Sequence, residues 1–100
     1  MEKRIPHYSL ADIQTRVIEQ GIMSFTATAI FNAAAMGLSA EQAIQVVGSL
    51  NRSMFYKSMT THADNSIWQD VYHVPCTVAV LYVKFTTDVE GYLVISFKEK

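Results

Sequence analysis

Residues 55–72, FYKSMTTHADNSIWQDVY, mark the point at which the character of the chain changes. β-Branched and aromatic residues alternate with polar ones on either side of a polar segment, residues 62–66, and this two-residue period is typical of strands joined by a turn. The pattern continues toward the C-terminus. It predicts strands at residues 54–61, 67–73, 78–86 and 92–97, with a turn at residues 88–91 between the last two.

The part of the chain before this stretch has a helical pattern. Ser9 is a candidate N-cap, and apolar residues then recur at helical spacing until Gly21. Residues 26–36 are rich in alanine and predict a second helix that ends at Gly37, and Ser39 caps a third. The expected buried stripes are Leu10, Ile13, Val17 and Ile18 in the first helix and Ala43, Ile44, Val47 and Leu50 in the third.

Two shorter segments complete the expected fold. Residues 1–7 are charged and contain Pro6, so we expect an extended, mobile arm, and residues 23–25 allow a very short strand. Helices followed by an antiparallel sheet predict an α+β fold, in which three N-terminal helices cover one face of a mostly antiparallel C-terminal sheet. A length of 100 residues with 50% hydrophobic content fits one domain, residues 1–100.

Alternation in the last two strands predicts which residues share a face. The apolar residues expected to point toward the helices are Leu81, Val83, Phe85, Leu93, Ile95 and Phe97. Tyr82 and Lys84 then lie on the outer face, where Tyr82 pairs with Ser96 or Lys98. Tyr82 and Lys98 are therefore expected to be direct or diagonal neighbours.

Two polar residues in the preceding strands fit this pattern less well. Alternation groups Lys57 with Phe55 and Met59, where a lysine is awkward unless it borders a cleft or a β-bulge re-aims it. Gln69 shares a face with apolar neighbours. From the residues alone, Lys57 is as well explained by a lysine on a sheet edge, and Gln69 by a glutamine that hydrogen-bonds buried backbone.

Composition limits the possible partners and location. Eight Lys and Arg residues against nine Asp and Glu give a formal net charge of -1, so a nucleic acid would have to bind a local basic face. The lone Cys76 cannot form an internal disulfide, and no secretory leader opens the chain. No apolar run approaches the ~20 residues of a membrane span. We expect a cytoplasmic protein without membrane contact.

Four stretches carry a resemblance to a known family: MEKRIPH, FYKSMTTHADNSIWQDVY, YVKF and VISFKEK. Together they resemble the motility quorum-sensing regulator toxins of bacterial type II toxin–antitoxin systems, and the match spans essentially the whole chain. The resemblance implies a RelE-like ribonuclease fold. It also implies an mRNA interferase that cuts single-stranded RNA at short GC-containing sites such as GCU, and the family's functional residues fall on Lys57, Gln69, Tyr82 and Lys98.

Metal-free RNA cleavage uses the neighbouring 2′-hydroxyl as nucleophile, so the protein must move protons and stabilise charge at phosphorus. We expect Lys57 and Lys98 to face the phosphate oxygens and Tyr82 to transfer a proton. Gln69 would orient the phosphate or a base edge.

Further RNA contacts are expected from His62, in a turn beside the strand of Lys57, and from Tyr56 and Lys84. His7 and His73 are expected to be exposed to solvent without a role. Three scattered histidines and one cysteine lack metal-ligand spacing, so we predict no metal and no other cofactor.

The resemblance also implies a protein partner, a zinc-containing helix-turn-helix antitoxin, and contact with promoter DNA only through that antitoxin. One alternative is left open. The chain could be a non-catalytic interaction module, or an attenuated toxin, that mainly binds a partner protein. Residues 72–77 contain no arginine, although toxins of the family often carry arginines in this connection.

Overall fold

The computed structural model describes residues 1–75, 80–88 and 90–99. The helices are α1 (Leu10–Gln20), α2 (Ala27–Ala35) and α3 (Ala40–Gly48), with short 3₁₀ helices η1 (Gly21–Ser24) and η2 (Arg52–Met54). The strands are β1 (Glu2–Lys3), β2 (Phe55–Thr60), β3 (Trp68–Pro75), β4 (Val80–Thr87) and β5 (Leu93–Glu99). The predicted α+β class is confirmed.

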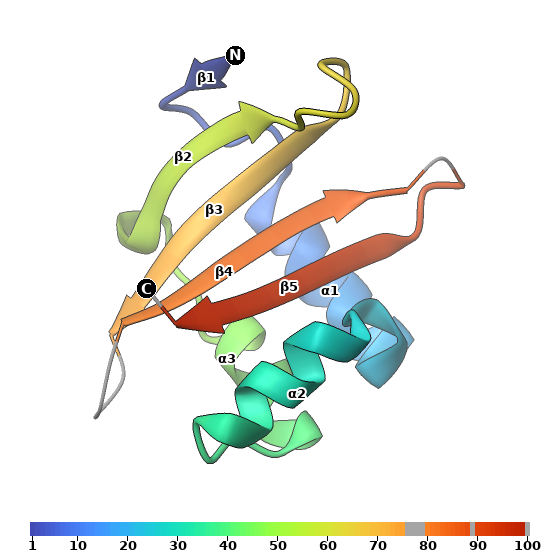
Figure 1. Ribbon diagram of the computed structural model, residues 1–100, viewed down its shortest axis with the longest axis vertical. Helices are drawn as coiled ribbons and strands as arrows, with labels where there is room; N and C mark the ends of the chain where they lie inside the picture. The colour runs from blue at the N-terminus through green and yellow to red at the C-terminus, as the bar shows by residue number, and fades with distance from the viewer. Residues whose placement is uncertain (76–79, 89, 100) are drawn as a thin grey trace.

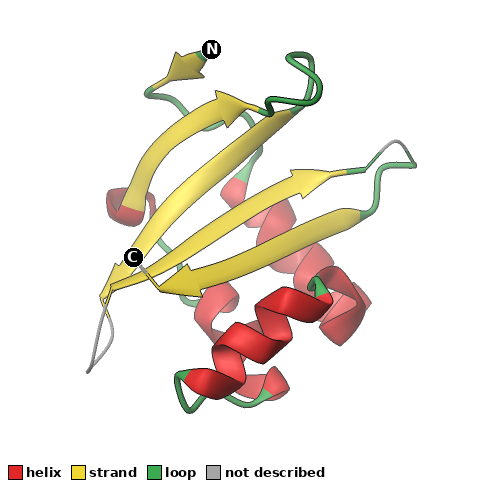
Figure 2. Ribbon diagram, in the orientation of Figure 1, coloured by secondary structure: helices red, strands yellow, loops and turns green. Residues whose placement is uncertain are grey.

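The strands form one sheet in the order β1-β2-β3-β4-β5, and each neighbouring pair is antiparallel. Figure 1 shows α1 and α3 behind the sheet and α2 running beside β5. The helical and strand halves of the chain therefore form two layers (Figure 2), as predicted. No helix of the described residues lies on the opposite face of the sheet.

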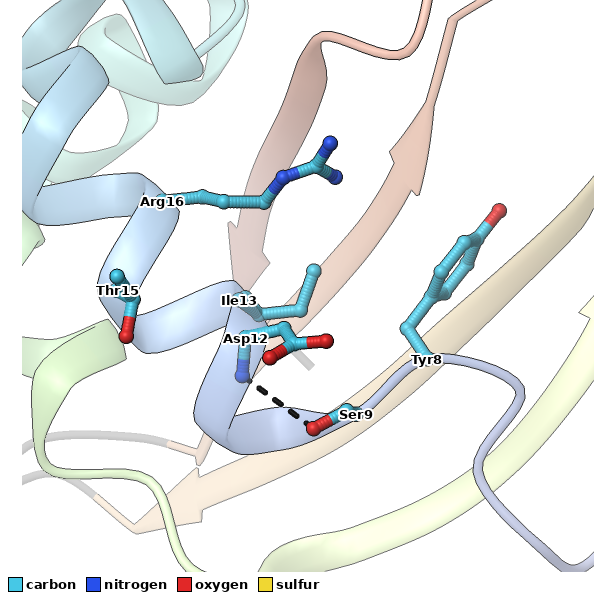
Figure 3. A pocket seen from close by; sticks show the side chains of 6 residues that line it. All are labelled: Tyr8, Ser9, Asp12, Ile13, Thr15 and Arg16. Carbon is cyan, nitrogen blue, oxygen red and sulfur yellow. Dashed lines mark hydrogen bonds between the residues drawn. The ribbon is translucent and has the colours of Figure 1, made fainter.

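Side-chain caps fix the helix ends where the sequence predicts them. The amide of Asp12 donates to Oγ of Ser9, 3.3 Å away, at the start of α1 (Figure 3), and Gly21 ends this helix with a φ of 59°. At the start of α3, Ser39 and Gln42 form a reciprocal capping box. Both pairs satisfy backbone amides that have no partner within the helix.

The core lies between the helices and the inner face of the sheet. It contains the six strand residues predicted to point there and also Ile13, Val17, Ala29, Ala33, Ala43, Val47, Leu50 and Tyr72. Ile18 is an exception, because its side chain is 74% exposed although the helical spacing predicted a buried position. Ile18 lies one position beyond Val17, on the side of α1 that turns away from the sheet.

The short strand predicted at residues 23–25 is not formed, and the start of another predicted strand is not described. Residues 21–24 form η1 instead of a strand, and Phe25 makes a single parallel bridge to Ile95. The predicted start of the strand at residue 78, like Cys76, lies outside the described residues. Within the described part of the chain, no helix is long and apolar enough to cross a membrane.

The expectation of a mobile N-terminal arm is wrong. Glu2 and Lys3 form β1, which pairs with Met59 and Ser58 of β2. The backbone amides of His7 and Tyr8 donate to the two carboxylate oxygens of the buried Asp70, at 3.0 and 2.9 Å. A charged acceptor strengthens such hydrogen bonds, so Asp70 ties the arm to the centre of the sheet.

Replacement of Asp70 by alanine should release the arm. We expect Asp70→Ala to lower the free energy of unfolding by roughly 2 kcal/mol, because two charge-assisted hydrogen bonds are lost. Urea unfolding measures this cost, and faster hydrogen exchange at the His7 and Tyr8 amides reports the release. Asp64→Ala is the matched control, since Asp64 accepts two bonds from Ser66 in an exposed turn; equal effects of the two variants would contradict the assigned role of Asp70.

Candidate active site

The outer face of the sheet carries the residues that the sequence singled out. Tyr82 pairs directly with Lys98, and Lys84 pairs with Ser96, in the register of β4 and β5. The predicted neighbourhood of Tyr82 and Lys98 is therefore confirmed. Both pairs are on the face opposite to the core, because the residues that alternate with them are buried against the helices.

A β-bulge brings Lys57 to this face. Phe55 pairs with Tyr72, whereas Lys57 pairs with Val71, so Tyr56 is an extra residue in β2. Phe55 packs against the core, and the bulge turns Lys57 to the other side. This is one of the two arrangements that would make a lysine acceptable there.

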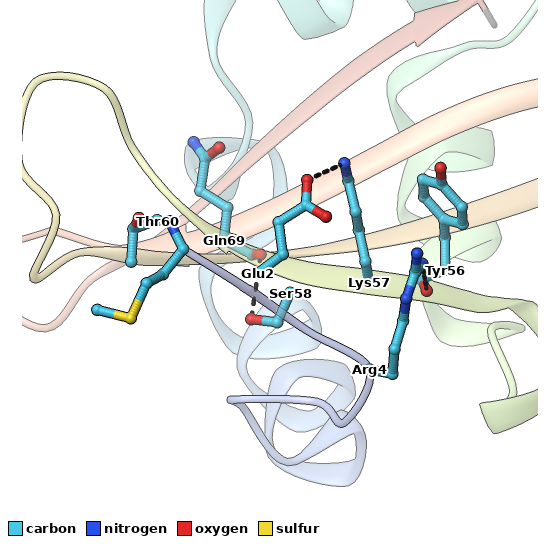
Figure 4. A network of polar contacts seen from close by, with 8 residues as sticks. Glu2, Arg4, Tyr56, Lys57, Ser58, Thr60 and Gln69 are labelled. Atoms are coloured by element: carbon cyan, nitrogen blue, oxygen red, sulfur yellow. Dashed lines mark hydrogen bonds and ion pairs between the residues drawn. The ribbon is translucent and has the colours of Figure 1, made fainter.

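The side chain of Gln69 lies on the same outer face as that of Lys57. In Figure 4 the side chains of Lys57 and Gln69 project from one side of the strands, while Ser58 points to the other side and donates to the carbonyl of Gln69. Val71, the residue between Gln69 and His73 on this face, is fully buried. Lys57 and Lys84 flank Val71 in the register of the sheet.

The candidate residues occupy different rows of the sheet. Tyr82 pairs with His73 on β3, whereas Gln69 lies four residues earlier on that strand. Four residues of a strand span about 13 Å of backbone, so Gln69 and Tyr82 approach a common phosphate only through side chains that lean toward each other. Lys57 is between them, next to Val71. The register thus brings Lys57, Tyr82 and Lys98 closer to one another than to Gln69.

Glu2 of β1 is paired with Lys57. The Nζ atom of Lys57 lies 2.6 Å from Oε1 of Glu2, and their side chains are 17% and 53% exposed. This hydrogen bond raises the pKa of Lys57 and lowers the pKa of Glu2, so both groups remain charged. Tyr56 and Tyr82 also act on Lys57 electrostatically, which is consistent with their being near it. The sequence analysis missed Glu2 because nothing local indicated that the arm joins the sheet.

Lys84 is held in a less hydrated environment than an ordinary surface lysine. Burial lowers its pKa, and the neighbouring Lys98 lowers it further by charge repulsion. An anion that reached this pair would relieve the repulsion. Among the described strand residues on the outer face, Glu2 is the one carboxylate, and the cations are Lys57, Lys84 and Lys98.

Three aromatic rings adjoin these lysines. The imidazole of His73 stacks on Tyr56 with ring centroids 4.3 Å apart, and its centroid lies 4.8 Å from that of Tyr82. The expectation that His73 is simply exposed is wrong, because it is partly buried between the two tyrosines. Two-residue alternation from Gln69 could have found it, since residues 69, 71 and 73 share a face.

The remaining candidates divide between the two faces. His62 is exposed and lines a depression of about 510 Å³ together with Glu2 and Lys57. Trp68 is on the helix side, where His7 stacks on it at 5.4 Å and the Nζ atom of Lys3 lies 4.2 Å from its ring centroid. Residues 1–75, 80–88 and 90–99 contain no cluster of three or more His, Cys, Asp or Glu side chains that could hold a metal ion.

Fold and site together define a small α+β protein with a cationic, tyrosine-bearing sheet face on a chain of net charge -1. Comparison with known proteins gives the family. A family model described as "Motility quorum-sensing regulator, toxin of MqsA" matches residues 5–99. This chain belongs to that toxin family. One relative, described as the mRNA interferase toxin MqsR of Escherichia coli strain K12, is 40% identical over 100 residues and is covered, like this chain, over 100% of its length.

The ion pair between Glu2 and Lys57 should make stability depend on pH. A carboxyl whose pKa is lowered by folding stabilises the fold above its ordinary value of 4.5, and this contribution disappears as the pH falls through the lowered value. Wild type should therefore be more stable than Glu2→Gln at neutral pH, and the difference should vanish at a pH acidic enough to protonate the carboxyl. Denaturant unfolding at both pH values checks this; a difference that persists in acid would show that the carboxylate charge is not its origin.

Proposed function

We propose that this toxin is a metal-independent endoribonuclease that cleaves single-stranded mRNA and thereby inhibits translation. The observation that carries the proposal is the common sheet face of Lys57, Tyr82 and Lys98. Family membership and the relative described as an mRNA interferase toxin support it. As in the sequence analysis, we expect short GC-containing sites such as GCU to be cut.

The reaction that suits these groups is attack of a 2′-hydroxyl on the adjacent phosphorus. Ammonium groups stabilise the charge that develops on the phosphate oxygens, and partial exclusion of water strengthens this effect. We assign this role to Lys57 and Lys98, and proton transfer to Tyr82. Because Gln69 lies about 13 Å along β3 from the Tyr82 row, we assign it to a base edge or a neighbouring nucleotide and not to the scissile phosphate.

The flanking residues would hold the rest of the RNA. Lys84, which feels the charge of the nearby Lys98, would bind a phosphate, and the ring of Tyr56, which is 39% exposed, would contact an unpaired base. His62 would contact RNA at the depression that it shares with Lys57. Together these contacts form a path from the β2–β3 turn toward the far end of β4.

The finer features implied by the family belong to the same proposal. We propose a RelE-like fold, a cytoplasmic location, and neutralisation by a zinc-containing helix-turn-helix antitoxin resembling MqsA, through which the complex would contact promoter DNA. The description "toxin of MqsA" for the matching family supports such an antitoxin.

Cleavage of labelled RNA in the presence of EDTA tests the proposed chemistry. Wild type should produce fragments with a 2′,3′-cyclic phosphate and a 5′-hydroxyl. Lys57→Gln and Tyr82→Phe should each reduce the cleavage rate roughly 10²-fold or more, by analogy with the loss of single transition-state donors. Sequencing of the new ends identifies the cleavage site.

Matched controls are available on the same protein. Tyr92→Phe removes an exposed phenol just before the start of β5, at the end far from Lys98, and Lys3→Gln removes an ammonium on the helix side of the sheet. Both should cleave at the wild-type rate. Absence of cleavage across RNAs of varied sequence would favour the alternative of a non-catalytic interaction module or an attenuated toxin.

RNA binding should be limited by Glu2. The carboxylate of Glu2 accepts a hydrogen bond from the ammonium group of Lys57, which we assign to the RNA phosphate. RNA must therefore displace the carboxylate to bind Lys57. We expect Glu2→Gln to tighten binding of RNA that lacks the reactive 2′-hydroxyl, by roughly threefold to tenfold at low salt, and the gain should shrink as added salt screens the charges. Fluorescence anisotropy measures both. Weaker binding would instead mean that Glu2 holds Lys57 in its productive position.

A further inference from the structure

The imidazole of His73 lies between Tyr56 and Tyr82 in the proposed site, with its Nε2 atom buried. On β3, His73 is the cross-strand partner of Tyr82, and Tyr82 is the partner of Lys98 on β5. On the other side, the ring of Tyr56 stacks on it at 4.3 Å. His73 is thus nearer than Gln69 to the tyrosine and lysine that carry the proposed chemistry.

None of the other residues proposed for the site is suited to accept the proton of the attacking 2′-hydroxyl. Lysine and tyrosine side chains have ordinary pKa values of about 10, so near neutral pH they donate protons and do not accept them. Glu2 raises the pKa of Lys57 and holds it in the ammonium form. A glutamine cannot take up a proton. Histidine is the side chain whose ordinary titration falls between about pH 5 and 8.

Resting on the proposed nuclease function, we propose that His73 is the catalytic residue that accepts the proton of the attacking 2′-hydroxyl. Its neighbours match this role. The rings of Tyr56 from β2 and Tyr82 from β4 contact it. Lys57 and Lys84 pair with Val71, two residues along β3, and Lys98 of β5 pairs with Tyr82. Two further charged groups lie farther out: Arg4 lies over the ring of Tyr56, and Glu2 is paired with Lys57.

The proton transfers balance with Tyr82 as the acid. Neutral His73 takes the 2′-hydroxyl proton while the 2′-oxygen forms a bond to phosphorus. The bond between phosphorus and the 5′-oxygen breaks, and that oxygen takes the phenolic proton of Tyr82. The products are a 2′,3′-cyclic phosphate and a 5′-hydroxyl. The imidazolium then returns its proton to the Tyr82 phenolate, whose ring centroid is 4.8 Å away.

A pH profile of single-turnover RNA cleavage in EDTA tests this role. Wild type should gain activity from acid toward neutral pH as the imidazole loses its proton. His73→Phe keeps an aromatic ring between the tyrosines but has no titratable nitrogen. It should lose about 10² to 10⁴-fold in rate near neutral pH, together with the acidic limb of the profile. Its affinity for RNA with a 2′-deoxy group at the cleaved position should stay within about threefold of wild type.

The controls separate catalysis from stacking and from misfolding. His7→Gln, which changes a histidine on the helix side of the sheet, should keep the wild-type profile. If His73→Phe binds RNA poorly, His73→Ala with added imidazole replaces it, and recovery of cleavage supports the proposal whereas folded protein without recovery overturns it. A His73→Phe protein with wild-type rate and acidic limb would overturn the role of His73 alone. Failure of the wild type to cleave RNA would overturn the nuclease function itself, and the role of His73 with it.

Discussion

The bulge at Tyr56 is the local constraint on which the arrangement of the outer face depends. In a regular strand, Phe55 and Lys57 would point to the same side, and one of them would be misplaced. The extra residue lets Phe55 enter the core while Lys57 turns outward. It also presents Tyr56 and Lys57 in succession on the uncovered side, where Tyr56 covers His73.

The helical half of the chain fixes the position of the strands that carry Tyr82 and Lys98. Besides packing on the inner face, it closes the free edge of β5. The amide of Thr26 donates to the carbonyl of Ile95 at 3.0 Å, and Nδ2 of Asn32 donates to the carbonyl of Phe97 at 2.8 Å. Gln20 exchanges two bonds with the backbone of Leu93. An edge closed in this way does not offer its backbone to a further strand, and β5 is held at a fixed position against the helices.

Positive charge gathers on one face of this protein, so the net charge of the chain was a poor guide to whether it has a surface for nucleic acid. The outer face gathers Lys57, Lys84 and Lys98 on a chain whose overall charge is -1. Repulsion between Lys84 and Lys98 is not relieved within the described part of the chain, whereas Lys57 has Glu2. The face is therefore cationic where β4 and β5 meet, and where β1 meets β2 the carboxylate of Glu2 offsets part of the positive charge of Lys57 and Arg4.

Local sequence signals predicted most helices and strands, whereas the features that the sequence analysis missed depend on contacts between distant residues. Caps such as Ser9 and Ser39 and the alternation in β4 and β5 depend on neighbouring residues, so the sequence contains them directly. β1 has two residues and pairs with β2 more than fifty positions away, and Asp70 holds the following residues His7 and Tyr8, so no local pattern could reveal it. His73 is different. Its parity with Gln69 was visible in the sequence, but its position at a strand end suggested exposure.

The roles of the site residues were predicted from the family resemblance and not from local sequence patterns. Alternation could group Tyr82 with Lys98, but only the family resemblance distinguished Lys57 and Gln69 from an ordinary edge lysine and a backbone-bonding glutamine. The register then adds information that the resemblance lacked. It separates Gln69 from the Tyr82 row and brings His73 into that row, so the order of residues along β3 matters as much as their common face.

This separation has a consequence for how the proposed enzyme would select its substrate. Chemistry would occur at the end of β3 near His73, whereas Gln69 and the depression beside His62 are toward the other end. The two positions are about 13 Å apart along the backbone, so a strand of RNA that runs along β3 could contact them with different nucleotides. Base recognition at Gln69 would then set the register of the RNA. A change at Gln69 should consequently alter which bond is cut, while a change at Tyr82 should alter only how fast.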